Sequence, residues 1–257
     1  MSHTDDFDDK AVLVTGAGSG IGRETALTFA DANANVVVAD IDEDGGQETV
    51  EQIEAETSSD ATFATVDVTD DEDVHQAVET AVEEYGGLDV AFNNAGIGGT
   101  FDSTADIEES AWLTILDVNL TGIWRCMRHE IPAMLDGGGG AIVNTASILG
   151  AVGEAGTPAY TASKHGVLGL TKVAALDYAT EDIRVNAVCP GYIETQMLED
   201  AGVTTDADML ERTKELHPMK RLGQSEEIAD AVLWLASERA SFVTGESLFV
   251  DGGYVSR

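Results

Sequence analysis

Basic residues, cysteine and proline are scarce in this chain of 257 residues, and long apolar runs are missing. The two cysteines, Cys126 and Cys189, both lie in apolar segments, so we expect buried thiols and neither a disulfide framework nor a metal site. Four prolines and 43% hydrophobic residues exclude long disordered linkers and favour a compact globule. No apolar run approaches the roughly 20 residues that a membrane-spanning helix needs.

Acidic residues are abundant in contrast, and they dominate the charge. Forty-eight Asp and Glu against 13 Lys and Arg give a formal net charge of −35. Because the acidic residues are spread along a chain that also carries a core pattern, a disordered acidic protein is excluded. Such a surface repels nucleic acid and anionic membranes, so we expect neither as a partner. Residues 1–9 lack the basic and apolar regions of a signal peptide, and we expect a cytoplasmic protein.

Scattered acidity of this kind, with only five lysines, resembles the proteins of salt-loving archaea. In those proteins bulk salt screens the repulsion between surface carboxylates. The resemblance implies a salt-adapted (halophilic) protein.

Short β-branched runs alternate with helical segments along the whole chain. The expected strands are residues 10–15, 36–40, 61–66, 88–92, 141–145, 183–188 and 246–250. The expected helices are 23–32, 42–57, 70–85, 107–135, 158–178 and 225–236, the last with Ser225 as its N-cap. This alternation predicts a single α/β domain, residues 1–257, with a doubly wound parallel seven-stranded sheet flanked by helices, a Rossmann fold. Residues 192–222 are irregular or weakly helical and long enough to form a substrate lid.

The first expected strand leads into a glycine-rich turn that a helix follows at once. In this context the glycines let a pyrophosphate approach the backbone, and the amides at the helix N-terminus point at it. The candidate binding residues are Gly16, Ser19, Gly20, Ile21 and Gly22.

Asp40 ends the second expected strand, eighteen residues after Gly22. A carboxylate there can accept both hydroxyls of an adenosine ribose and repel a 2′-phosphate, although an Asp also suits a helix N-cap. Ser19 and Ile41, where a basic residue could attract a phosphate, are uncharged, and Arg23 is the only nearby cation. The pattern favours NAD over NADP.

Polar residues also follow the third and fourth strands, at the edge where open α/β sheets bind ligands. Asp67, followed by Val68, can meet an adenine edge or cap the next helix. Asn94, Ala95 and Gly96 belong to the same crevice or form a plain Asx turn. Asn119 falls inside an expected helix, where Asn is unfavourable, so a surface accident and a functional placement both remain open.

The stretch 147–164 carries three side chains that can do chemistry together. Tyr160 and Lys164 follow Pro158, which is typical of a first helical turn, and their spacing puts them on one helix face. A neighbouring cation favours the phenolate, so a tyrosine with a reference pKa of about 10 can become an acid/base near neutral pH. Ser147 can return in space to share a substrate oxygen with Tyr160. Alone, such a Tyr/Lys pair also occurs on ordinary helix surfaces.

In register, these motifs closely resemble the classical short-chain dehydrogenases/reductases over nearly the whole chain. The matching segments are Thr15–Gly22, Asn93–Gly96, Asn119, Ser147, Tyr160 with Lys164, and Pro190–Gly191. The resemblance implies an NAD-dependent enzyme that interconverts a secondary alcohol, or a sugar hydroxyl, and a ketone by hydride transfer. It also implies a homotetramer built from the helices at 107–135 and 158–178 and from the last strand.

The same resemblance implies a role for each matching residue. Tyr160 would be the general acid/base, Ser147 would orient the substrate oxygen, and Asn119 would hold a water of a proton relay. Lys164 would hold the nicotinamide ribose and lower the pKa of Tyr160. Pro190, Gly191, Ile193 and Thr195 would line the nicotinamide, with Thr195 bonding its carboxamide.

Two rival functions remain at this stage. A 3-oxoacyl-thioester reductase belongs to the same family, but acidic acyl carriers would be repelled by this surface and Asp40 disfavours NADPH. An NAD-binding sensor without turnover would need none of the proton machinery. The residues expected to line the pocket are mostly apolar and favour a small neutral alcohol or ketone: Gly98, Ile148, Leu149, Val152, Tyr192 and Met197.

The net charge makes stability depend on salt. We expect activity and helical circular dichroism to be lost on dialysis to millimolar salt, because the Debye length falls from about 30 Å at 0.01 M to about 3 Å at 1 M and only the latter screens neighbouring carboxylates. Thermal unfolding across a KCl series measures this. Full stability at millimolar salt would contradict the prediction.

Overall fold

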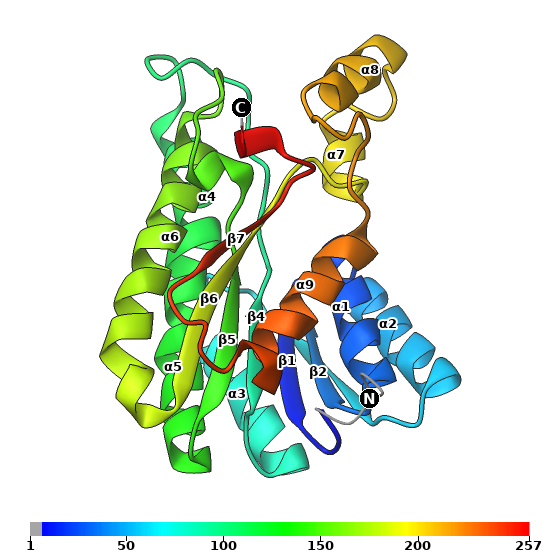
Figure 1. The fold of residues 1–257 in the computed structure, drawn as a ribbon, viewed down its shortest axis with the longest axis vertical. Coiled ribbons are helices and arrows are strands. Elements are labelled where there is room, and N and C mark those ends of the chain that lie inside the picture. Colours follow the sequence, from blue (N-terminus) through cyan, green and yellow to red (C-terminus); the bar gives the residue numbers. More distant parts are fainter. Residues whose placement is uncertain (1–6, 257) are drawn as a thin grey trace.

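The computed structural model describes residues 7–256, so the acidic residues 1–6 of the N-terminal stretch lie outside the described residues. Seven parallel strands form one sheet in the order β3-β2-β1-β4-β5-β6-β7 (Figure 1). Their bounds are β1 Ala11–Thr15, β2 Asn35–Asp40, β3 Ala61–Thr65, β4 Val90–Asn93, β5 Gly140–Thr145, β6 Ile183–Pro190 and β7 Ser247–Val250. The chain runs outward from β1 to β3 and returns to β4, so the strand order reverses between β1 and β4. The predicted fold class is confirmed.

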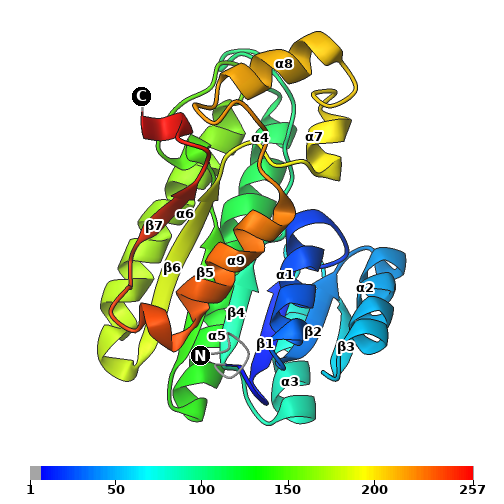
Figure 2. The same cartoon turned by 45° about the vertical axis from the view of Figure 1, so that its right-hand side comes forward.

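Helices cover both faces of this sheet (Figure 2). One layer consists of α1 Gly20–Asp31, α2 Glu43–Glu56 and α9 Ser225–Ala236; the other consists of α3 Asp71–Tyr85, α4 Glu109–Leu116, α5 Gly122–Gly137 and α6 Pro158–Tyr178. Two short helices, α7 Gln196–Asp200 and α8 Ala207–Glu215, lie beyond the end of β6 (Figure 1). They supply the helical part of the expected lid. No helix within residues 7–256 is long and apolar enough to cross a membrane.

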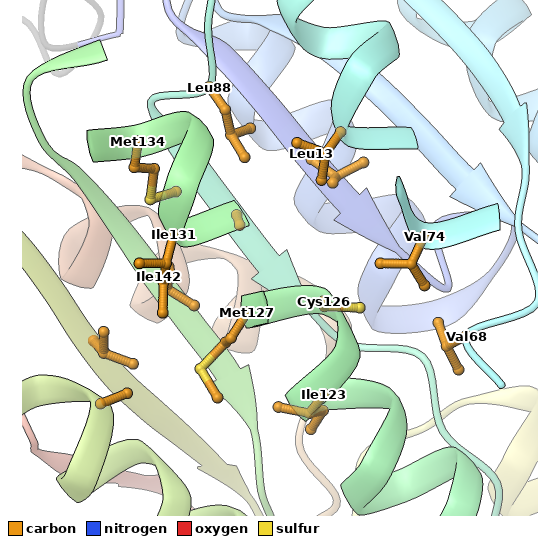
Figure 3. Packing of buried hydrophobic residues seen from close by; sticks show 14 of the residues in the cluster. Leu13, Val68, Val74, Leu88, Ile123, Cys126, Met127, Ile131, Met134 and Ile142 are labelled. Atoms are coloured by element: carbon orange, nitrogen blue, oxygen red, sulfur yellow. The ribbon is translucent and has the colours of Figure 1, made fainter. Parts of the chain in front are cut away.

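The alternation of strand side chains creates two hydrophobic cores, one on each face. In β1, Val12 and Val14 pack with Phe29 of α1, whereas Leu13 faces the core beneath α3 and α5. Both faces of a parallel sheet are covered, which explains why the strands read as continuous apolar runs. Figure 3 shows the second core, where Cys126 and Met127 of α5 pack among the aliphatic side chains. Both cysteines are buried free thiols, as predicted.

The expected helix 107–135 differs from the structure in one informative way. The helical path begins at Glu109, and the five residues Asp117–Thr121 between α4 and α5 form a π-helical turn. A π turn inserts one extra residue per turn and often marks a functional site. Asn119 lies in its middle and is fully buried, so the surface-accident interpretation of this residue is wrong.

The start of α9 is a second difference. Ser225 is the first helical residue, and Gln224 occupies the N-cap position that we assigned to Ser225. The Glu227 carboxylate accepts a hydrogen bond from the Gln224 backbone N–H at 2.9 Å. In return, the Gln224 side chain accepts from the backbone N–H of Glu227, so the two residues form a reciprocal capping box. The cap therefore lies one residue earlier than expected.

Candidate active site

The turn after β1 leaves room only for glycine at several positions. A Cβ at Gly22 would lie 1.9 Å from the carbonyl oxygen of Gly16, and one at Gly16 would lie 2.9 Å from Ala95 Cα. Gly16 and Gly20 also have positive φ angles, 66° and 53°, which side chains disfavour. The turn is thus a bare backbone cradle at the N-terminus of α1, with Ile21 packed partly on the core. This is the shape and polarity that a dinucleotide pyrophosphate requires, so the residues fit a nicotinamide cofactor.

Asn94 ties the end of β4 to this cradle. Its side-chain Nδ2 donates to the carbonyl oxygens of Thr15 and Gly16, both at 3.2 Å. The hydroxyl of Thr15 in turn accepts from the backbone N–H groups of Asn94 and Ala95. The Asn94 amide therefore fixes the walls of the crevice, and the plain-turn interpretation of this segment is incomplete.

Asp40 lies beside the glycine turn. Its carboxylate accepts from the backbone N–H groups of Gly18 at 2.7 Å and Asp42 at 2.9 Å. The N-cap of α2 is Asp42, so the alternative role of Asp40 as that cap is wrong. In dinucleotide-binding folds, a carboxylate beside the glycine turn hydrogen-bonds the adenosine ribose.

Arg23, the cation nearest to Asp40, is already engaged. Its guanidinium donates to the Thr49 hydroxyl at 3.1 Å, to the carbonyl of Gly18, and to the Glu48 carboxylate at 2.8 Å. The ion pair with Glu48 offsets its charge, which leaves little attraction for a 2′-phosphate.

Asp67 does not cap the helix that follows it. Asp70 does so, accepting from the Glu72 N–H at 2.9 Å, while Asp67 bonds the backbone and hydroxyl of Thr69. The neighbouring Val68 packs its side chain against Gly122. Val68 is 6% exposed, so what it can offer a ligand is its backbone.

Ser147, Tyr160 and Lys164 converge beside the end of β5. Ser147 hydrogen-bonds the Tyr160 phenol and accepts from the Leu149 N–H at 3.1 Å, which orients its hydroxyl. Lys164 Nζ donates to the carbonyl oxygen of Thr145 at 2.8 Å and lies 5.6 Å from the centre of the Tyr160 ring. The three side chains, of which Ser147 and Lys164 lie 17 positions apart in the sequence, therefore share one site as predicted.

The electrostatics of this group differ from the expectation for Tyr160. Burial raises the pKa of Tyr160, and this effect outweighs the Ser147 hydrogen bond that lowers it. Burial also lowers the pKa of Lys164 to about 8. We expected Lys164 to lower the pKa of Tyr160. Lys164 Nζ donates to the Thr145 carbonyl and is not among the causes that shift the pKa of Tyr160, so the expectation is not met in the protein without cofactor.

Asn119 is held by the segment that follows β4. Its Oδ1 accepts from the Ile97 N–H and its Nδ2 donates to the Ile97 carbonyl, both at 2.8 Å. A Cβ at Gly96 would lie 3.1 Å from Asn119 Oδ1 and 3.8 Å from Lys164 Nζ. Asn119 and Lys164 therefore both lie close to Gly96, and the π turn brings Asn119 to the same site as Lys164.

The segment after β6 closes the other side of the crevice. A Cβ at Gly191 would lie 3.0 Å from both His217 Nε2 and Asp251 Cα, so the chain passes these two residues closely at Gly191. Thr195 lies against the glycine turn, 3.4 Å from where a Gly20 Cβ would be. Ile193 between them is buried. The cofactor segments predicted from the ends of β1, β4 and β6 therefore meet in space.

The expected pocket residues fall into two groups. Ile148 and Leu149 are buried under the site, whereas Met197 of α7 is 45% exposed and lies against Gly98 across the opening. Our sequence reasoning missed Glu154, which accepts a hydrogen bond from Tyr192. Nothing in the spacing of the loop 148–157 indicates which of its side chains turns inward. A cavity of about 330 Å³ lies between the segment after β6 and the end of β7, and Tyr192, His217 and Asp251 are among its lining residues. None of the three converging side chains lines it.

No cluster of three or more metal-ligating side chains occurs in the described part of the chain.

Known proteins with this sequence pattern and fold are numerous. A family model described as enoyl-(acyl carrier protein) reductase matches residues 16–255. A cyclohexanol dehydrogenase from Acinetobacter sp. (strain SE19) is 47% identical, with 98% of this chain and 97% of the relative covered. A cis-4-hydroxycyclohexanecarboxylate dehydrogenase from Sinomonas cyclohexanicum is 41% identical, covering 97% and 98%. The crystal structure of carveol dehydrogenase from Mycobacterium avium in complex with NAD superposes with a TM-score of 0.94 at 31% identity, covering 99% and 100%.

The matched model spans almost the entire chain, and the relatives are aligned from end to end at well above 30% identity. Together with the glycine cradle and the Ser147, Tyr160 and Lys164 group, this places the chain in the short-chain dehydrogenase/reductase family of oxidoreductases, which use a nicotinamide cofactor.

Proposed function

We propose that the protein is an NAD-dependent dehydrogenase that oxidises a small, uncharged alicyclic secondary alcohol to the ketone. The carrying observation is the convergence of Ser147, Tyr160 and Lys164 beside the glycine cradle. The relatives named for cyclohexanol and for a hydroxycyclohexane acid support a ring-shaped substrate. The apolar side chains expected around the opening support the same class.

The side chains divide the proton chemistry among them. Tyr160 accepts the hydroxyl proton of the alcohol, Ser147 holds the same oxygen, and Lys164 stabilises the anionic phenol and binds the cofactor ribose. Asn119 continues the path from Lys164 toward solvent through a water. An oxidised nicotinamide held beside this group would supply the hydride acceptor. Alcohol and oxidised cofactor thus yield ketone, reduced cofactor and one proton.

The cofactor would lie along the crevice between the two halves of the sheet. Its phosphates would meet the backbone of the glycine turn, and its adenosine ribose would meet Asp40. Candidate contacts elsewhere are Ile41, Asp67, Val68, Asn94, Ala95, Gly96, Pro190, Gly191, Ile193 and Thr195.

A 3-oxoacyl-thioester reductase is the second candidate function, and the description of the matched family, an acyl-carrier-protein reductase, favours it. Two observations disfavour it. The net charge of −35 repels acidic acyl carriers unless salt is high. Asp40 beside the turn, together with the neutralised Arg23, disfavours NADPH. Purified acyl-carrier thioesters tested with both reduced cofactors would separate the two functions. An NAD sensor without turnover is the non-enzyme alternative, and the intact proton machinery disfavours it.

Self-association is part of the proposal. Leu113, Trp124, Val173 and Leu176, on α4, α5 and α6, are between 45% and 83% exposed. Other apolar residues of these helices, such as Ile123, Val167 and Leu168, face the core and add nothing to this surface. Pairing of α4–α6 with a second copy would cover the exposed set, which supports the homotetramer. The acidic surface supports a salt-rich cytoplasm as its setting.

Asp40 should make NAD the preferred cofactor, because a 2′-phosphate would meet its carboxylate. Wild-type kcat/KM should favour NAD strongly over NADP. Asp40→Asn should lower kcat/KM for NAD by about 10- to 100-fold, the range for losing a hydrogen bond to a charged group. Asp42→Asn removes the same charge two residues away and should leave the preference unchanged. An enzyme that prefers NADP would contradict this and point to Arg23 as the selector.

Tyr160→Phe should leave NAD binding intact and lower turnover by at least ~10²-fold, as expected for losing general acid–base catalysis. The wild-type oxidation rate should rise with pH along one limb, since the phenolate is the active form. In the NAD complex the midpoint should lie below about 10, because a positive nicotinamide favours the anion. Without cofactor, the pKa of Tyr160 is raised, so a wild-type minus Tyr160→Phe ultraviolet titration should place it above 10. Near-normal turnover of Tyr160→Phe would overturn the mechanism.

Light scattering in molar salt should give the mass of a tetramer. Leu176→Glu places a charge on the most exposed apolar position of α6 and should reduce the mass. Ser58→Glu adds the same charge at an exposed loop before β3 and should not. A monomeric wild-type protein in high salt would refute the assembly.

A further inference from the structure

A single hydrogen bond joins two segments that flank the catalytic residues. Tyr192 Oη donates to Glu154 Oε1 at 2.6 Å. Glu154 lies in the loop between Ser147 and α6, and Tyr192 opens the lid segment after β6. The contact therefore links two segments whose residues lie 38 positions apart in the sequence.

Both partners lie close enough to the acid/base to act on it. The charge of Glu154 is one of the causes that raise the pKa of Tyr160. The phenol of Tyr160, in turn, is among the groups that raise the pKa of Tyr192, behind burial and Glu154. The substrate oxygen bound by Tyr160 therefore lies within the field of the Glu154 carboxylate.

Tyr192 is held rigidly in this position. Its ring meets His217 edge-on with centroids 5.7 Å apart and lies 6.1 Å from the ring of Tyr254. Its backbone N–H donates to His217 Nε2 at 3.4 Å. These contacts position the Tyr192 ring, and its hydroxyl holds one oxygen of Glu154 through the hydrogen bond.

The Glu154 carboxyl group has hydrogen-bonding capacity that the protein leaves unused. Within residues 7–256, Glu154 takes part in no ion pair, and its Oε2 has no hydrogen-bond donor. A carboxylate can accept up to four hydrogen bonds, and Tyr192 uses one. A hydrogen-bond donor of a ligand can therefore bind to the Glu154 carboxylate, whereas an anionic ligand would be repelled by it.

We propose that Glu154, positioned by Tyr192, selects substrates by their charge and by their number of hydroxyl groups. Its carboxylate accepts a hydrogen bond from the second hydroxyl of a neutral alicyclic diol and repels alcohols that carry a carboxylate. The inference rests on the proposed alcohol dehydrogenase function and narrows its substrate class. The interaction is a direct contact of a partly buried side chain, which salt screens much less than it screens exposed and distant charges, so we expect the selection to persist in molar salt.

Three substrates and three variants test this: cyclohexanol, a cyclohexanediol and 4-hydroxycyclohexanecarboxylate, with Glu154→Gln, Tyr192→Phe and Glu181→Gln. The wild type should favour the diol over cyclohexanol by about tenfold and over the carboxylate by about 100-fold or more. Glu154→Gln should raise kcat/KM for the carboxylate at least about tenfold. Tyr192→Phe keeps the charge and should still reject the carboxylate. Glu181→Gln removes the same charge at an exposed position just before β6, at the opposite end of that strand from Tyr192, and should leave all three kcat/KM values unchanged.

The pH profile provides a readout that a merely structural role would not move. The groups facing Tyr160 are Lys164 on its own helix, Ser147 after β5, Glu154 in the loop and Tyr192 after β6. Glu154→Gln removes one negative charge from this set, so the midpoint of the oxidation limb should move to lower pH. A diol-to-carboxylate ratio unchanged within about twofold, or a stationary limb, would overturn the assignment.

A binding measurement on the wild type separates this inference from the proposed function. Cyclohexanecarboxamide should stabilise the NADH complex against heat at lower concentrations than cyclohexanecarboxylate, whether or not any test alcohol turns over. If none of the three alcohols is oxidised, the proposed function fails, and the paired ligands still decide the role of Glu154. Equal stabilisation by the two ligands would overturn it.

Discussion

The hydrogen bond from Lys164 Nζ to the Thr145 carbonyl connects the catalytic helix to the sheet. It fixes the first turns of α6 against the end of β5, where the chain continues directly into Ser147. Lys164 is 3% exposed, so this carbonyl satisfies an ammonium group that would otherwise be buried without an acceptor. Tyr160, one turn earlier, is placed next to Ser147 by the same contact. The geometry of the proton chemistry thus depends on one buried donor finding one strand carbonyl.

Burial has a cost at this site, and the pKa directions express it. Desolvation favours neutral groups, so it raises the pKa of Tyr160 and lowers that of Lys164 to about 8. Both shifts oppose the charged pair that alcohol oxidation needs. Under the proposed function, the positive charge of an oxidised nicotinamide would favour the phenolate of Tyr160 and offset the effect of burial. The same logic makes the Glu154 charge important, because it acts in the opposite direction on the same phenol.

The fold and much of the candidate site could be predicted from sequence for identifiable reasons. Fully covered parallel strands produce short apolar runs, and the glycines of the first turn are dictated by contacts such as Gly22 against Gly16 O. Tyr160 and Lys164 are neighbours by helix geometry alone. The role of Asp40 could not be separated from that of a helix cap, because only the structure assigns the cap to Asp42. The assigned roles of the site residues remain predictions that the mutants must test.

Other features depend on contacts between distant segments, which local patterns do not encode. A helical periodicity over 107–135 conceals the π turn, because one extra residue leaves the apolar pattern nearly intact while rotating Asn119 toward Ile97 and Gly96. Glu154 follows from no spacing rule either: its orientation is set by Tyr192, whose own position is set by His217 and Tyr254. The pairing of Tyr160 with Lys164 can thus be predicted from a short-range sequence pattern. The proposed selection of substrate depends instead on a contact between distant segments, the hydrogen bond from Tyr192 to Glu154, so relatives can share the first group of residues and differ in this contact.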